Sequence, residues 1–173
     1  MIRKVRDMLF NLGKLFASAL ALALLFNHVV ILNAAVPTPS MVNTVPAPSQ
    51  NIAFRLAYMF AEPRRYDVVV FPAPDTGELY VKRIIGLPGE VIEIKAGKVY
   101  VNGSEYPLRD DFVDYPSADD WGPRMVPANH YFVLGDNRVN SLDSRRWDNT
   151  YVPRKTIQGK LVLTYYPGFN FIK

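Results

Sequence analysis

The feature that most constrains this chain is a stretch of 40 residues, 15–54, that contains no Asp, Glu, Lys or Arg. Its first part, residues 15–36, is nearly all apolar. As a helix these residues would measure about 33 Å, enough to cross a hydrocarbon core of about 30 Å. We therefore predict a transmembrane helix at residues 15–36. A cleaved secretory signal and a buried or interfacial helix remain open as alternatives.

Charge is distributed unevenly around this segment. Residues 1–14 carry four basic side chains and one acidic side chain, and basic residues tend to stay on the cytoplasmic side of a membrane span. We expect residues 1–14 to be cytoplasmic and residues 37–173 to form the extracytoplasmic domain of a single-pass cell-membrane protein. Residues 55–173 carry 16 basic and 15 acidic side chains. This near-neutral balance does not support a nucleic-acid partner.

The chain has no cysteine and only two histidines, His28 and His130. Disulfides, thiolate metal sites and a cysteine nucleophile are therefore excluded, and a histidine-rich zinc site is not supported. Residues 104–127 include five aspartates, but their spacing matches no EF-hand loop and favours a solvated surface excursion. We predict neither a metal nor a cofactor.

Beyond the apolar segment the sequence favours strands. A proline-rich stretch at residues 36–48 cannot continue a helix, and residues 51–60 fit either a short helix or a strand. Ala96-Gly97 and Asn102-Gly103 are typical of tight turns. Short segments rich in β-branched and aromatic residues, separated by Gly, Pro, Asn or Asp, predict strands; they are residues 67–71, 79–85, 91–94, 98–101, 131–134 and 157–165. The predicted fold class is mainly β.

Two residues stand out as able to perform chemistry, Ser40 and Lys82. A serine among prolines is usually only a turn residue. Lys82, however, lies in an apolar strand-like segment, on one face with Tyr80 and Ile84 and with Arg83 as the outward neighbour. A buried lysine loses the hydration of its charged form, so that its pKa falls and its neutral amine can activate a serine hydroxyl. The alternative is a strand lysine that reaches solvent.

Residues 135–145 (GDNRVNSLDSR) pack polar side chains densely after a predicted strand. This segment could be only a turn closed by a salt bridge. It could equally place the Ser141 hydroxyl against the lysine amine and brace it with an Asp143–Arg145 pair.

Three segments together resemble bacterial type I signal peptidases, the membrane-bound Ser/Lys leader peptidases that remove signal peptides from exported preproteins. They are residues 37–41 (PTPSM), 80–90 (YVKRIIGLPGE) and 135–145. The resemblance implies an antiparallel β-sheet catalytic body after one transmembrane helix. It also implies a serine endopeptidase that works through an acyl-enzyme at the outer membrane surface. Its partners would be signal peptides and membrane lipid, with small residues such as Ala at the first and third positions before the cut.

The resemblance implies a role for each matching position. Ser40 would be the nucleophile and Lys82 the general base, while the Ser40 N–H and the Thr38 hydroxyl would form the oxyanion hole. Ser141 would orient the lysine amine. Other positions would line the substrate pocket (Val36, Met41 and Tyr80), keep water from the lysine (Phe71 and Val133) or support the loop (Asp136, Asn137, Asp143 and Arg145).

One position departs from the family pattern. The residue before the nucleophile is commonly glycine and here is Pro39, which has a fixed φ and no N–H. This departure keeps open a second interpretation, a catalytically weakened, membrane-tethered β-domain that acts as an adaptor. A third is a Ser/Lys autoprotease, which would be cytosolic and would not need the apolar segment.

Overall fold

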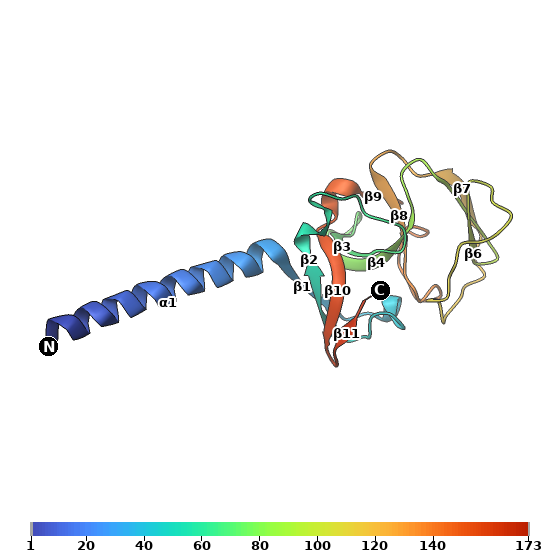
Figure 1. Ribbon diagram of the computed structural model, residues 1–173. Coiled ribbons are helices and arrows are strands. Elements are labelled where there is room, and N and C mark those ends of the chain that lie inside the picture. The colour runs from blue at the N-terminus through green and yellow to red at the C-terminus, as the bar shows by residue number, and fades with distance from the viewer. Residues whose placement is uncertain (1, 173) are drawn as a thin grey trace.

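The computed structural model describes residues 2–172, which form one long helix joined to a β body (Figure 1). Helix α1 (Ile2–Val30) projects away from that body. Within Arg3–Val30 an 18-residue window has a mean hydropathy of 1.9, and none of it is buried inside the protein. Among the described residues this is the one helix long and apolar enough to cross a membrane.

Helix α1 ends at Val30, so the predicted helix over residues 15–36 is wrong for its last six residues. These form strand β1 (Ile31–Val36), in which Leu32, Ala34 and Val36 are buried and face the core. An uninterrupted apolar run suits a helix and a half-buried strand alike, so its composition could not place this boundary. The boundary is set by the antiparallel pairing of β1 with β2, which begins at Ile31.

One large antiparallel sheet forms the part of the body next to α1 (Figure 1). The strand order is β1-β2-β10-β3-β4-β8-β9, and β11 pairs with β10. Short 3-10 helices η1, η2 and η3 interrupt the connections. Their bounds, with those of the remaining strands of this sheet, are β2 (Ser49–Phe54), β3 (Val68–Pro72), β4 (Leu79–Gly86), β8 (His130–Leu134), β9 (Val152–Pro153), β10 (Gly159–Tyr166), β11 (Asn170–Phe171), η1 (Pro39–Met41), η2 (Arg55–Tyr58) and η3 (Arg154–Thr156).

A smaller sheet lies at the end of the body away from α1 (Figure 1). Its order is β6-β5-β7, with β5 at Val91–Lys95, β6 at Lys98–Val101 and β7 at Trp121–Met125. The turn between β5 and β6 consists of Ala96 and Gly97, both at positive φ, as a two-residue hairpin turn of this kind requires.

All six strands expected from their β-branched and aromatic content are present, with ends within two residues of those predicted. The fold class, mainly antiparallel β after one N-terminal apolar helix, is confirmed. Strand β7 was not expected, because Gly122 and Pro123 interrupt it and the surrounding residues 104–127 are polar. The ambiguous residues 51–60 supply most of β2 and all of η2.

The large sheet curls so that its first strand, β1, contacts β4, four places further along the order. A core cluster that includes Val36, Met41, Val70 and Val81 fills the space inside this curl. The segment that links β1 to β2, which contains η1, is held beside β4 by this core. The fold thereby brings two parts of the chain 42 residues apart, Ser40 and Lys82, into contact.

Candidate active site

The serine lies in a short, well-defined turn. Pro39 is the first residue of η1 and Ser40 the second. The fixed φ of proline suits a first helical position, where an N–H would have no partner within the helix. The Val42 N–H donates to the Pro39 carbonyl at 3.1 Å and closes the turn. The departure from glycine at residue 39 is therefore compatible with this backbone.

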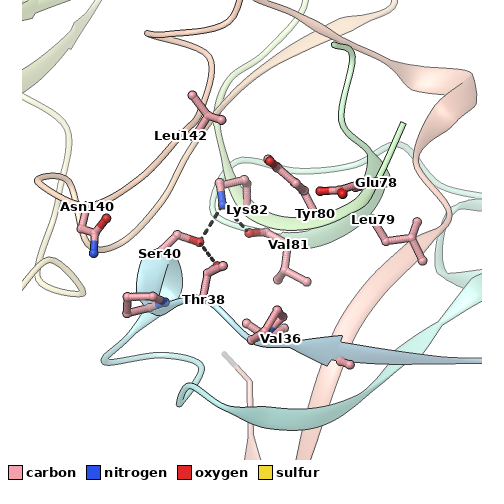
Figure 2. A pocket seen from close by; sticks show the side chains of 13 residues that line it. Val36, Thr38, Ser40, Glu78, Leu79, Tyr80, Val81, Lys82, Asn140 and Leu142 are labelled. Atoms are coloured by element: carbon pink, nitrogen blue, oxygen red, sulfur yellow. Dashed lines mark hydrogen bonds between the residues drawn. The ribbon is translucent and has the colours of Figure 1, made fainter. Parts of the chain in front are cut away.

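The lysine comes from the middle of β4 and points at that turn (Figure 2). Lys82 Nζ donates to Ser40 Oγ at 2.7 Å and to the Val81 carbonyl at 3.2 Å. Lys82 is 3% exposed and Ser40 6% exposed. The Nζ atom also lies 5.2 Å from the centre of the Tyr80 ring. A short hydrogen bond thus joins a nearly dry amine to a hydroxyl.

This environment changes the titration of the lysine. Burial lowers the pKa of Lys82 from 10.5 to about 8, against the opposing effect of the Asp143 and Asp136 carboxylates. The effect of burial dominates because removing water penalises the ammonium form more than the two carboxylates stabilise it. Phe71 and Val133, expected to shield the lysine, are fully buried in a cluster against which Tyr80 packs.

The pair lies in a cleft with a volume of about 310 Å³. Val36 and Tyr80, both predicted to line a substrate pocket, do line it. Met41 does not lie there: it is 0% exposed and packs into the core beneath the turn. The lining consists of Ala35, Val36, Pro37, Thr38, Pro39, Ser40, Glu78, Leu79, Tyr80, Val81, Lys82, Asn140 and Leu142.

The loop of residues 135–145 holds the serine turn from one side. The Asn137 N–H donates to the Ser40 carbonyl at 3.1 Å, and its side-chain amide donates to the Pro39 carbonyl at 3.3 Å. Asp136, expected only to shape the loop, accepts two hydrogen bonds from Arg83, at 2.9 and 2.7 Å. Thr44, just after the turn, also donates to Asp136.

Arg83 is not the outward neighbour that strand alternation suggested, because it is only 3% exposed. Besides Asp136 it donates to the Tyr66 carbonyl and to the Thr44 hydroxyl. Its guanidinium group also stacks 4.3 Å from the centre of the Phe112 ring. Strand β4 is buried on both faces over residues 81–86, so alternation alone could not tell an exposed face from a buried one.

Asp143 and Arg145 lie together, as the resemblance implied. Arg145 donates to both carboxylate oxygens of Asp143, each at 2.9 Å, and Asp143 also accepts the Gly135 N–H at 3.0 Å. Arg145 reaches further, to the Asp119 carboxylate at 2.7 Å and the Ser117 hydroxyl at 3.1 Å. The acidic surface excursion is thereby tied to the loop beside the active site.

Ser141 lies close to the turn, but no hydrogen bond joins it to Lys82. Its Oγ is buried and has no hydrogen-bond partner among residues 2–172. A Cβ at Gly135 would clash with this Oγ and with the Ser40 carbonyl oxygen. The lack of a side chain at Gly135 therefore lets the loop and the turn approach each other. The orienting role of Ser141 stays a prediction.

Several cleft residues were missed in the sequence. Asn140 and Leu142 flank Ser141, and Glu78 and Leu79 precede Tyr80. The only feature of the sequence that could have indicated a place in the cleft is that these four residues are adjacent to motif residues. The Thr38 hydroxyl was expected near the nucleophile, and its oxygen lies 3.5 Å from Ser40 Oγ (Figure 2).

Comparison with known proteins supports the same interpretation. The family described as signal peptidase, peptidase S26, matches residues 9–166. A signal peptidase I from Leptolyngbya laminosa is 39% identical over 140 residues, 76% of this chain and 67% of that protein. A probable signal peptidase I-2 from Synechocystis is 35% identical over 163 residues, 91% of this chain and 73% of that protein.

The fold has a solved counterpart as well. The crystal structure of a signal peptidase I from Enterococcus faecalis V583 matches with a TM-score of 0.51 at 33% identity, covering 58% of this chain and 97% of that one. The sequence resemblance is thus confirmed by relatives over most of the chain and by a solved structure. The chain belongs to the signal peptidase family, peptidase S26, and is a serine endopeptidase.

Proposed function

We propose that this protein removes signal peptides from exported preproteins, with Ser40 as the nucleophile and Lys82 as the general base. The observation that carries the proposal is the 2.7 Å hydrogen bond between Lys82 Nζ and Ser40 Oγ in a buried site. The lowering of the Lys82 pKa to about 8 supports it, because a neutral fraction of the amine then exists at physiological pH.

The reaction proceeds in two stages. Ser40 Oγ attacks the carbonyl carbon of the scissile peptide bond as Lys82 Nζ accepts the hydroxyl proton. Lys82 then donates this proton to the departing amine, the C–N bond breaks, and the signal peptide remains as an ester on Ser40. The same amine takes a proton from a water molecule, which attacks the ester carbonyl. The bond between Ser40 Oγ and the carbonyl carbon then breaks, Lys82 returns the proton to Ser40 Oγ, and the signal peptide leaves with a free carboxyl group. A positioned base of this kind accelerates a reaction by about 10² to 10⁴-fold.

An oxyanion hole would stabilise the tetrahedral intermediate. The Ser40 N–H lies in the first turn of η1, where an N–H group has no partner within the helix. The Thr38 hydroxyl, 3.5 Å from Ser40 Oγ, is the second proposed donor. Removal of one such donor typically costs about 10² to 10³-fold in rate.

Substrate would bind as an added strand. Strand β1 is at one edge of the large sheet, and β4 pairs with β8 only from Arg83 onward. The facing edges of β1 and of residues 79–82 border the cleft and can accept an extended peptide through main-chain hydrogen bonds. Val36 and Tyr80, which line the cleft, suit small side chains near the cut.

The membrane would concentrate enzyme and substrate in one plane. We propose that α1 spans the cell membrane in contact with lipid, with the N-terminus cytoplasmic and the β body outside. Arg3, Lys4, Arg6 and Lys14 at its start support this orientation. The signal segment of a preprotein lies in the same membrane, so its cleavage site reaches the cleft at a raised effective concentration.

The decisive experiment is processing of a preprotein by the full chain in detergent. Wild type should yield the mature product, Ser40→Ala should yield none, and Ser104→Ala, at an exposed serine outside the cleft, should match wild type. Cleavage by Ser40→Ala at the wild-type rate would refute the assigned nucleophile. Binding without cleavage by wild type would favour the adaptor, and cleavage of its own chain alone would favour the autoprotease.

A further inference from the structure

One charged side chain of the cleft has no role in the proposed chemistry. Of the thirteen lining residues only Glu78 and Lys82 are Glu, Asp, Lys, Arg or His. Lys82 is committed to Ser40, whereas Glu78 is exposed. None of the ion pairs formed within residues 2–172 includes Glu78. An exposed carboxylate without an ion pair therefore lies at the wall of a cleft in which Lys82 is the one other charged side chain.

The position of Glu78 relative to the reacting atoms follows from strand geometry. Glu78 immediately precedes β4 and stands four residues before Lys82, about 13 Å along an extended chain. Residues two apart share a face, so Glu78 belongs to the face of Tyr80 and Lys82. Figure 2 shows the Glu78 carboxylate beside Tyr80, at the end of the cleft away from Ser40.

This end of the cleft is the side on which substrate residues before the cut would lie. Strand β1 leads from the end of α1 toward Ser40, and residues 78–81 lead toward Lys82. A signal segment lies amino-terminal to its cleavage site and leaves the membrane beside α1. An extended substrate would therefore place its residues before the scissile bond along β1 and the start of β4.

We infer that Glu78 is a specificity-determining residue, one that favours a basic side chain and disfavours an acidic one four or five residues before the cut. This inference rests on the proposed function. Attraction between partly solvated opposite charges amounts to a few tenths to about 1 kcal/mol, which corresponds to about twofold to fivefold in kcat/KM. Glu78 thus adds a charge preference to a cleft whose other walls sort substrates by size.

The test uses the full chain in a non-ionic detergent and two series of peptides with an Ala-X-Ala cleavage site. Each series carries Lys, Gln or Glu at the fourth or at the fifth position before the bond. Wild type should cleave the Lys peptide about twofold to fivefold faster than the Gln peptide at one of these positions, and the Glu peptide correspondingly more slowly. Salt at about 1 M, where the screening length is about 3 Å, should remove the difference.

Two variants make the test specific. Glu78→Gln should bring the Lys-to-Glu ratio of kcat/KM close to one, while Glu105→Gln, at an exposed glutamate outside the cleft, should keep the wild-type ratio. Equal ratios in wild type and Glu78→Gln would overturn the inference, as would a wild-type ratio close to one at both positions. If wild type cleaves no peptide, the proposed function fails instead, and a Ser40→Ala control identifies that case.

Discussion

At the scale of single residues, burial of the Lys82 amine is energetically unfavourable for its charged form, and it is this burial that lowers its pKa. The folded protein keeps the amine nearly dry, although Asp136 and Asp143 lie near enough to favour its charged form. Because burial destabilises the ammonium form relative to the neutral amine, the pKa falls. A lysine needs a lowered pKa to act as a base near neutral pH.

Activity should therefore rise with pH. In the proposed mechanism only the neutral amine accepts the Ser40 proton, so kcat/KM for a peptide substrate should increase through pH 7 and reach half of its maximum near pH 8. Lys82→Arg should show no activity at any pH, since guanidinium stays protonated. Initial rates measured from pH 6 to 10 check both statements, and a flat profile would exclude a lysine base.

The charged form of Lys82 should also destabilise the folded protein, and this destabilisation should fade as pH rises. A pKa shift from 10.5 to about 8 corresponds to about 3 kcal/mol of destabilisation while the lysine is charged in both folded and unfolded states. Lys82→Met, which keeps the apolar stem, should raise the melting temperature at pH 7. The unfolded chain binds the extra proton between about pH 8 and 10.5, so the advantage should shrink over that range. Thermal unfolding at pH 7 and 10 measures it; equal gains at both values would contradict this account.

At the scale of elements, the loop 135–145 and the serine turn act as one unit. Asn137 holds the turn through two hydrogen bonds, one from its N–H to Ser40 and one from its side chain to Pro39. Arg83 and Asp136 join the same loop to β4. The distance between Ser40 Oγ and Lys82 Nζ, the proposed nucleophile and base, is therefore set by contacts outside the pair itself.

Asn137→Ala should lower kcat with little change in KM. The substitution removes the side-chain hydrogen bond to Pro39, and displacements near 1 Å in a catalytic group cost up to about 10²-fold. Asn149→Ala, which removes an exposed amide that bonds to Asp75, serves as the control. Steady-state kinetics on one peptide compares the two, and unchanged kcat in Asn137→Ala would remove this anchor from the mechanism.

Arg83→Ala should destabilise the fold by about 3–5 kcal/mol, because it leaves the buried carboxylate of Asp136 without its partner. The matched control is Arg109→Ala, which breaks the exposed pair with Asp111 and should change stability little. Denaturant unfolding followed by the fluorescence of the buried Trp147 distinguishes them. Similar midpoints for both variants would mean that the Arg83 pair is not a structural bond.

The sequence predicted strands well where β-branched residues alternate with turn signals, and it predicted Ser40 and Lys82 through motifs shared with a family. It could not separate α1 from β1, because both are apolar and only pairing with β2 distinguishes them. It also misplaced Arg83 and Met41. Both are buried by contacts with distant segments, which local pattern does not encode.

At the scale of the whole molecule, the helix and the β body make separate contributions. None of the apolar window of α1 is buried in the protein. The packing of the β body therefore does not depend on which apolar side chains this window carries. The helix contributes length and hydropathy, and the body contributes the site.

Replacing residues 15–28 by an unrelated apolar helical sequence should therefore leave peptide cleavage in detergent within about twofold of wild type. Leu22→Asp near the middle of the helix should instead weaken membrane integration, since a charge there costs about 3 kcal/mol. Alkaline extraction of membranes measures integration and peptide cleavage measures the site. Loss of cleavage in the apolar replacement would show that the helix packs on the body.

The direct passage from α1 into β1 has a geometric consequence. Val30 ends the helix, Ile31 is already paired with β2, and Ser40 follows ten residues after Val30. With no flexible spacer between them, in the proposed topology the reactive hydroxyl stays at a fixed height above the bilayer. Preproteins would then be selected by the number of residues between the end of their hydrophobic segment and the scissile bond. This selection would be independent of the side chains that the cleft binds.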